Sequence, residues 1–223
     1  MQISDLGYGI VPECLSNHEC EEIVEVLSAD VGSRGRAGAR HLMKNPVVSR
    51  LANDNRLTEF AGAWLGRLAV PFRATLFEKS GAASWLIPWR QDTALPLMER
   101  FDLAGWGPWS EKAGASYAHA PAWALSRVIA LRIHLDASDA DNGPLRVIPG
   151  SHLGGVLSDQ TVLEIVSAND SVECRVPQGG VIAMRPLIIH SSSKLRSAKS
   201  RRVLHIEYAD SLDLADGIRL AVV

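Results

Sequence analysis

The run Asn142-Gly143-Pro144-Leu145-Arg146-Val147-Ile148-Pro149-Gly150-Ser151-His152 decides the fold of this 223-residue chain. Together with Asp141, its first residues form a strong turn signal, and the β-branched residues that follow predict a short strand. An apolar run with β-branched residues, 128–135, precedes the same turn. We therefore expect these two strands to form a hairpin-like pair in a mainly β domain.

Outward from this run, the pattern changes from helical to β along the chain. Apolar residues recur at helical spacing over residues 16–29 and 46–65, so the first third is predicted to be helical. Glycines, prolines and three tryptophans in residues 99–123 predict a long loop or lid. Helical segments are followed in the sequence by several short strands, which favours a β-sandwich or jelly-roll core on which the helical third packs. Because no repeat or linker interrupts the chain, we expect one domain over residues 1–223. Further strands are expected at residues 73–79, 85–89, 181–184, 187–190 and 203–208.

The composition is that of an ordinary globular protein. Hydrophobic residues make up 47% of the chain and the formal net charge is −2, which excludes disorder and any broad attraction to nucleic acid or to an anionic membrane. The first residues lack the pattern of a signal peptide, and charges interrupt the apolar stretches well short of a membrane span. Cys14, Cys20 and Cys174 show no close zinc-type spacing, so reduced thiols are expected. A cytoplasmic enzyme is the expectation.

Several segments, in this order, resemble the landmarks of the phytanoyl-CoA dioxygenase family. They are Gly7-Tyr8-Gly9-Ile10-Val11, Trp89-Arg90-Gln91-Asp92, the run 142–152, His190 and Arg201-Arg202. The resemblance covers most of the chain and implies a double-stranded β-helix, the cupin-like jelly roll. It also implies an Fe(II)- and 2-oxoglutarate-dependent dioxygenase that hydroxylates a small organic substrate with dioxygen.

The resemblance also implies a site. In the family a His-x-Asp pair and a distal histidine hold Fe(II) and leave three positions open for 2-oxoglutarate and dioxygen. Asp92 matches the carboxylate and His190 the distal histidine. Arg201, eleven residues after His190, matches the arginine that binds the far carboxylate of 2-oxoglutarate, for which a planar guanidinium is suited. Ser192 is expected to add a hydroxyl contact to that carboxylate.

Arg90 stands where the family has its first metal-binding histidine. Residues i and i+2 of a strand share a face, so position 90 and Asp92 would both reach one metal. Arginine has no free lone pair and keeps its positive charge, so it cannot bind Fe(II) and can pair with Asp92 instead. Metal binding should therefore be impaired or altered.

Three explanations of Arg90 stay open. The first is a pseudoenzyme in which Arg90 and Arg201 both hold an organic acid such as 2-oxoglutarate. The second is an active enzyme that recruits another metal ligand, and the third is a variant of an otherwise ordinary enzyme. A candidate replacement ligand is His134, which shares a strand face with Arg132. Arg132 is expected to line the cofactor pocket, and Lys79 and Arg40 to contact an anionic ligand if they face the barrel. The sequence does not select a substrate. His119 is expected in the lid, and His152 in a stabilised turn.

Overall fold

Two sheets form the core of the protein, seen in a computed structural model that describes residues 3–29, 34–35, 38–80, 85–196, 199–215 and 217–223. The larger sheet has seven strands in the order β1-β12-β9-β14-β4-β3-β2. These strands are β1 (Tyr8–Val11), β12 (Val181–Met184), β9 (Val128–His134), β14 (Arg201–Ala209), β4 (Val70–Lys79), β3 (Gly38–Arg40) and β2 (Arg34–Gly35).

The smaller sheet faces the larger one and has the order β11-β10-β13-β5. Its strands are β11 (Val172–Cys174), β10 (Leu145–Val147), β13 (His190–Ser192) and β5 (Ile87–Arg90). Ala130, Ile182 and Met184 of the larger sheet pack against Leu145 and Val147 of the smaller one, which closes one end of the space between the sheets. The predicted double-stranded β-helix is confirmed.

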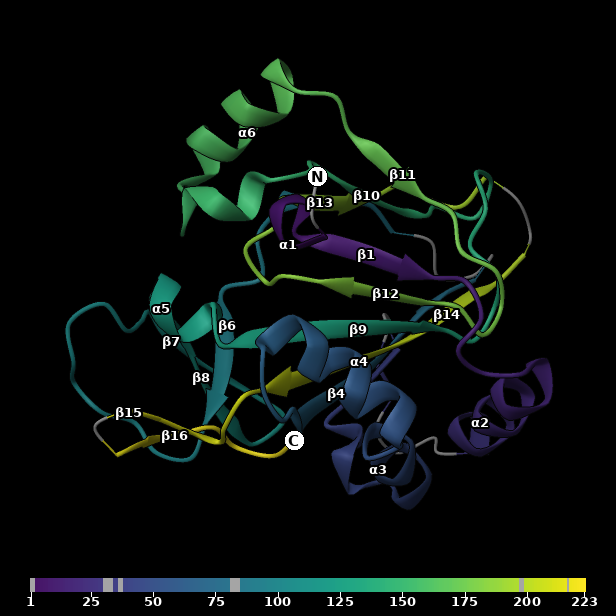
Figure 1. Ribbon diagram of the computed structural model, residues 1–223, viewed down its shortest axis with the longest axis horizontal. Coiled ribbons are helices and arrows are strands. Elements are labelled where there is room, and N and C mark those ends of the chain that lie inside the picture. Colours follow the sequence, from purple (N-terminus) through teal and green to yellow (C-terminus); the bar gives the residue numbers. More distant parts are fainter. Residues whose placement is uncertain (1–2, 30–33, 36–37, 81–84, 197–198, 216) are drawn as a thin grey trace.

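Helices cover the outer face of the larger sheet (Figure 1). Leu131 and Ile133 of β9 and Leu204 and Ile206 of β14 pack on them in one apolar cluster. The helices of this layer are α2 (Asn17–Ala29), α3 (Pro46–Ala52) and α4 (Asn55–Leu65), and the shorter helices nearby are α1 (Ile3–Leu6) and η1 (Leu42–Lys44).

The helical pattern predicted over 46–65 is divided into α3 and α4. The side chain of Asn45 accepts from the backbone N–H groups of Val47 and Val48, and Asp54 caps α4 by accepting from Arg56. A side chain that bonds the backbone at a helix start competes with continuation of the helix before it. The Asn53-Asp54 pair therefore ends one helix and begins the next.

Two expectations about the β region were wrong. Strands β9 and β10 do not form a hairpin, because β9 pairs with β12 and β14 whereas β10 pairs with β11 and β13. The turn at Gly143 instead carries the chain from one sheet to the other. Its φ is +67°, and a Cβ there would lie 2.3 Å from the carbonyl oxygen of Ser193, so this crossing requires glycine.

The second wrong expectation is the long loop at 99–123. A three-stranded sheet, β6-β8-β7, includes part of this segment and lies beside the barrel (Figure 1). The remaining elements are β6 (Ala94–Leu97), β7 (Trp109–Lys112), β8 (Ala115–His119), α5 (Ala122–Leu125), η2 (Ser151–Gly154), α6 (Asp159–Ala168), β15 (Asp213–Ala215) and β16 (Ile218–Arg219). Phe101, Trp106 and Trp109 pack into the apolar cluster under this sheet rather than forming an open lid.

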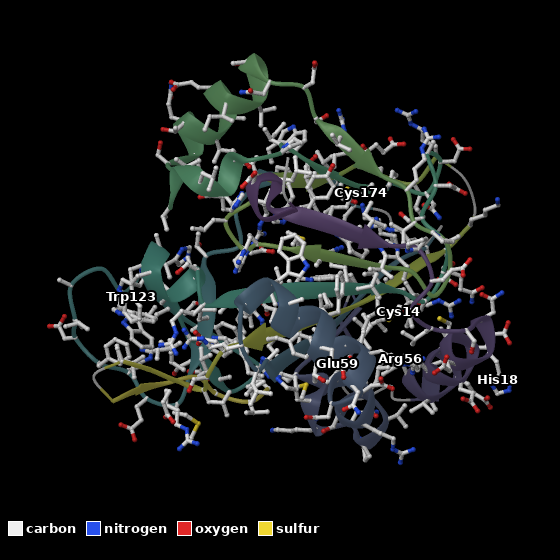
Figure 2. The ribbon with its side chains drawn as sticks, in the orientation of Figure 1. Cys14, His18, Arg56, Glu59, Trp123 and Cys174 are labelled. Atoms are coloured by element: carbon white, nitrogen blue, oxygen red, sulfur yellow. The ribbon has the colours of Figure 1, made fainter. Side chains whose placement is uncertain are left out.

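The expected reduced state of the cysteines can be compared with the structure. Cys14, Cys20 and Cys174 are all free thiols, and Figure 2 marks Cys14 before α2 and Cys174 on β11. Within the described ranges, no helix combines the length and the apolarity needed to cross a membrane.

Candidate functional site

The inner faces of β14, β9 and β4 carry polar side chains into the barrel. Because Leu204 and Ile206 of β14 pack on the helices, the alternate residues Arg201, His205 and Glu207 point the other way. The strand register places Arg201 opposite Lys79 of β4 and His205 opposite Arg132 of β9. Charged residues from three strands therefore share the interior.

Asp92 and His190 lie together, as the resemblance implied. His190 Nε2 is 3.5 Å from Asp92 Oδ2, and His190 Nδ1 is 3.0 Å from the carbonyl oxygen of Ile188. That carbonyl accepts only, so Nδ1 carries the proton and, in the neutral ring, Nε2 presents its lone pair to the carboxylate. Burial lowers the pKa of His190, while the neighbouring Asp92 carboxylate raises it. Two electron-pair donors thus face one point, an arrangement that suits a shared cation.

Arg90 occupies the position beside this pair. It lies opposite His190 in the β5–β13 register, and its Nη2 is 3.0 Å from Asp92 Oδ1. Burial alone would raise the pKa of the Asp92 carboxyl, but His190 and the Arg90 guanidinium hold this pKa well below its usual range. One carboxylate oxygen therefore faces Arg90 and the other faces His190.

These residues do not complete an iron site. A nonhaem Fe(II) triad needs two imidazoles and a carboxylate, whereas this site has one of each and a guanidinium. No group of three or more His, Cys, Asp and Glu side chains placed to hold a metal occurs in the part of the chain that the structure describes. Fe(II) would meet two donors, one of them already paired with a permanent positive charge.

The structure does not bring His134 to this pair. The side chain is completely buried, and neither ring nitrogen has a hydrogen-bond partner among the described residues. Burial lowers the pKa of His134, and the charges of Arg132 and Arg201 lower it further, so these two arginines are its charged neighbours. His134 therefore belongs to the arginine end of the barrel.

That arginine end holds an unusual concentration of buried positive charge. Ser192 Oγ accepts from Lys79 Nζ at 2.7 Å and from Arg201 Nη2 at 3.2 Å, while it donates to the carbonyl oxygen of Gly143 at 2.8 Å. Arg201 is 2% exposed, and Arg132 and Lys79 are equally deep. None of the three cations pairs with a carboxylate among the described residues. We call Lys79, Arg132, Ser192 and Arg201 the acid pocket.

The acid pocket contains unused donors. Arg201 Nε and Nη1 and Arg132 Nε are buried and have no partner in the described chain. Burial, with the charges of Arg201 and Arg132, lowers the pKa of Lys79 to about 7. Burial, with the charge of Arg132, lowers the pKa of Arg201 to about 9. Buried cations without an anionic partner are costly, and an anion bound among them would remove that cost.

Other residues singled out in the sequence lie elsewhere. Arg202 points away from Arg201 and makes a two-pronged ion pair with Asp136, with both N–O distances 2.7 Å. His119 Nδ1 is 2.7 Å from Thr93 Oγ1 on the side sheet. His152 packs against Gly7, where a Cβ would lie 2.3 Å from its ring. A groove of about 550 Å³, lined by residues 98–103 and 217–219, lies outside the barrel and includes none of the candidate residues.

Sequence reasoning missed the inner network of β14. His205 Nδ1 is 3.3 Å from Arg132 Nη1, and its ring packs edge-on against Phe77 with centroids 5.6 Å apart. Glu207 forms an ion pair with Arg73 of β4. The signal was available in the period-two pattern of residues 201–209, since His205 and Glu207 share a face with Arg201.

Comparison with known proteins points to one family. The sequence model described as phytanoyl-CoA dioxygenase (PhyH) matches residues 5–203. The L-proline trans-4-hydroxylase of Streptomyces griseoviridis is 29% identical over 191 residues, covering 73% of this chain, and the chain spans 62% of the length of that relative. EctD from S. alaskensis, solved with 2-oxoglutarate and 5-hydroxyectoine, superimposes with a TM-score of 0.72 at 20% identity, covering 95% of this chain and 74% of EctD.

A second EctD structure, with bound Fe, gives a TM-score of 0.68 at 18% identity and covers 93% of this chain and 74% of EctD. At these identities the two structures establish the fold.

Proposed function

Because the chain belongs to the phytanoyl-CoA dioxygenase family of Fe(II)- and 2-oxoglutarate-dependent oxygenases, we propose that it binds 2-oxoglutarate or a related dicarboxylate, and that Arg90 disables iron-dependent hydroxylation. The chain would then be an organic-acid-binding protein on an oxygenase fold. The proposal joins two ends of the barrel, the acid pocket and the Arg90–Asp92–His190 group.

The acid pocket carries the proposal. Arg201 has two unpaired donors, Nε and Nη1, and Nη2 carries a second N–H beside the one it gives to Ser192; Lys79 and Ser192 border the same space. A guanidinium donates charge-assisted hydrogen bonds to a carboxylate, and these are stronger where water is excluded. The cations have no protein carboxylate to bind within the described chain, which supports an acid as the native occupant.

Arg90 supports the second half of the proposal. Its guanidinium neutralises Asp92, so the carboxylate is satisfied without a metal. The same guanidinium, 55% exposed, is free to donate further hydrogen bonds to the second carboxylate of a bound acid. Dicarboxylate binding through Arg201 at one end and Arg90 at the other would need no iron.

A weak hydroxylase is the second candidate, because Asp92 and His190 remain arranged as a donor pair. An acid that chelates Fe(II) would add donors of its own, so metal and acid would bind only together. The substrate would then be a small molecule oxidised with dioxygen, as in the family. The two candidates differ in whether the acid binds without the metal.

Titration separates the candidates. Under anaerobic conditions we expect 2-oxoglutarate to bind the metal-free protein, as measured by calorimetry. Because the acid is held without a metal, Fe(II) should change the affinity for 2-oxoglutarate by less than about threefold; a tenfold change would require about 1.4 kcal/mol of coupling between the two ligands. No visible charge-transfer band should appear during the anaerobic titration with Fe(II), and no succinate should form after air is admitted. Binding that requires Fe(II), or succinate release, would instead establish the hydroxylase.

Binding of the acid should depend on pH through Lys79. The pKa of this ammonium is about 7 in the free protein, because burial and two arginines disfavour the charge, and a bound anion favours it. Above pH 7 the free protein must therefore take up a proton on binding, and affinity should fall by about tenfold per pH unit at first. Calorimetry between pH 6 and 8, below the pKa of Arg201, measures this slope. In Lys79→Met the slope should disappear, and an unchanged slope would assign the proton to another group.

A further inference from the structure

A second group of cations lies at the barrel mouth, on the side of Asp92 that faces the side sheet. We call Arg40, His41, Lys112 and Tyr117 the mouth cluster. Arg40 ends β3 opposite Thr75 of β4, so its side chain is on the barrel-facing side of the sheet together with Arg73. Lys112 ends β7, and Tyr117 is on the paired strand β8.

The hairpin of β7 and β8 positions Lys112. Ala113 and Gly114 have φ values of +47° and +79°, and such a two-residue turn with positive φ twists the strands tightly together. Lys112 Nζ lies 4.8 Å from the centroid of the Tyr117 ring, and Arg73 lies 5.6 Å from the same centroid. Tyr117 is buried, so it fixes the cations around it.

His41 connects the hairpin to the larger sheet. Its Nε2 is 2.9 Å from Tyr117 Oη, and its backbone is in the left-handed region at φ +59°. A residue other than glycine rarely adopts this conformation without compensation from its surroundings. The bond to Tyr117 supplies such compensation and links the residue that follows Arg40 to the hairpin.

The positive charge of the mouth cluster is not neutralised within the described chain. Burial lowers the pKa of Lys112, and the charges of Arg73, Arg40 and Arg90 lower it further, while Asp92 raises it. Asp92 already faces Arg90 and His190, and Arg73 already pairs with Glu207. Neither Arg40 nor Lys112 has an ion-pair partner among the described residues.

We infer that Arg40 and Lys112 form a second anion site, which binds a carboxylate or phosphate group of a ligand entering the barrel beside Asp92. The site is separate from the acid pocket, because it is built from β3 and the β7–β8 hairpin rather than from β9, β13 and β14. The ligand of the mouth is therefore a small organic oxyanion, bound in addition to the dicarboxylate. The inference does not require iron chemistry and does not depend on Arg201.

A merely structural role of Lys112 makes a different prediction. If the ammonium served only to hold the hairpin through its contact with Tyr117, removing it would lower stability without changing the binding of anions. Lys112→Arg would keep the charge and the ring contact, because a guanidinium also stacks on an aromatic ring. The experiment must therefore read out binding and unfolding separately.

The test titrates inorganic phosphate and, in a separate arm, acetate into the protein saturated with 2-oxoglutarate, at constant ionic strength. Backbone amide chemical shifts of residues 40–41 and 112–115 should change saturably in at least one arm, and the arm with the tighter binding identifies the oxyanion. Lys112→Met and Arg40→Met should each weaken this binding by about tenfold, since each removes a charged hydrogen-bond donor. Lys112→Arg should stay within about threefold of the wild type, less than the loss of one such bond.

The control is Arg175→Met, which removes a more exposed cation that directly follows β11 of the smaller sheet and pairs there with Glu173. It should leave the titration unchanged. Shifts that do not saturate in either arm, or equal affinities in the Met variants and the wild type, would overturn the inference. If 2-oxoglutarate fails to bind at all, the proposed function fails, and the same titrations without it still decide whether the mouth binds an anion.

Discussion

Arg90→His is expected to tighten Fe(II) binding by roughly a hundredfold or more, since even the loss of an outer partner of a metal ligand costs 10–100-fold in affinity. The substitution would supply a third donor two residues from Asp92 and opposite His190. It would also remove a charge that repels the dication and free Asp92 Oδ1, now 3.0 Å from Arg90. Anaerobic Fe(II) titration followed by calorimetry measures the affinity, and succinate release in air reports turnover of 2-oxoglutarate.

Arg90→Met separates the two effects of the substitution. It removes the charge but adds no metal ligand. Fe(II) affinity should therefore rise by less than about tenfold, which corresponds to about 1.4 kcal/mol of binding free energy. If Arg90→Met binds iron as tightly as Arg90→His, the site needs no second imidazole. If neither variant binds iron better than the wild type, Asp92 and His190 are not the metal ligands.

Arg201→Met is expected to weaken 2-oxoglutarate binding by at least about a hundredfold. Two hydrogen bonds to a charged group contribute about 1.5–3 kcal/mol each, and 2.7 kcal/mol already equals a hundredfold. Nη2 together with one of the unpaired donors, Nε or Nη1, of this buried side chain would make them. Calorimetry at pH 6.5, where Lys79 is still mostly charged, measures the loss.

The same substitution should stabilise the unliganded protein. Arg201 is a buried cation beside Arg132 without a carboxylate partner in the described chain, and a methionine fills a similar volume without charge. We expect the free energy of unfolding to rise by about 1–3 kcal/mol, the scale seen when buried charges are replaced by apolar residues. Arg202→Met is the control, because its partly exposed pair with Asp136 contributes about 1 kcal/mol and lies off the pocket. Lower stability of Arg201→Met with unchanged binding would make Arg201 structural.

Much of the fold could be predicted because local patterns carried it. The helix expected at 16–29 is α2, and the strand expected at 181–184 is β12. The helix has apolar residues at helical spacing, and the strand is a short apolar run between Gly179-Gly180 and Arg185-Pro186. The break at Asn53-Asp54 was missed because apolar spacing continues across it, and only the capping side chains interrupt the backbone.

Strand pairing could not be read in the same way. Core strands that follow one another, such as β9 and β10 or β12 and β13, mostly belong to opposite sheets, so neighbours in the sequence are often not partners in space. The hairpin expected between residues 128–135 and 145–148 assumed local pairing. The side sheet was missed because glycines and prolines in 99–123 resemble a loop, although the Ala113-Gly114 turn joins two paired strands.

For the candidate site, the family resemblance named Asp92, His190, Ser192 and Arg201, and the structure places them in two contacting pairs. The remaining partners come from distant strands and had no motif. Lys79 meets Ser192 from β4, and Tyr117 meets His41 across the mouth. Such contacts depend on sheet order, which single-sequence patterns do not contain.

The alternation along β14 also governs how the chain reaches its register. A slip by one residue would turn Arg201, His205 and Glu207 onto the helix layer and bury Leu204 and Ile206 among charges, a double penalty. The same polar side chains that would bind a ligand therefore also disfavour a shifted register of β14 during folding. Making the barrel interior uniformly apolar would raise the stability of several registers at once, so the chain would lose its preference for one.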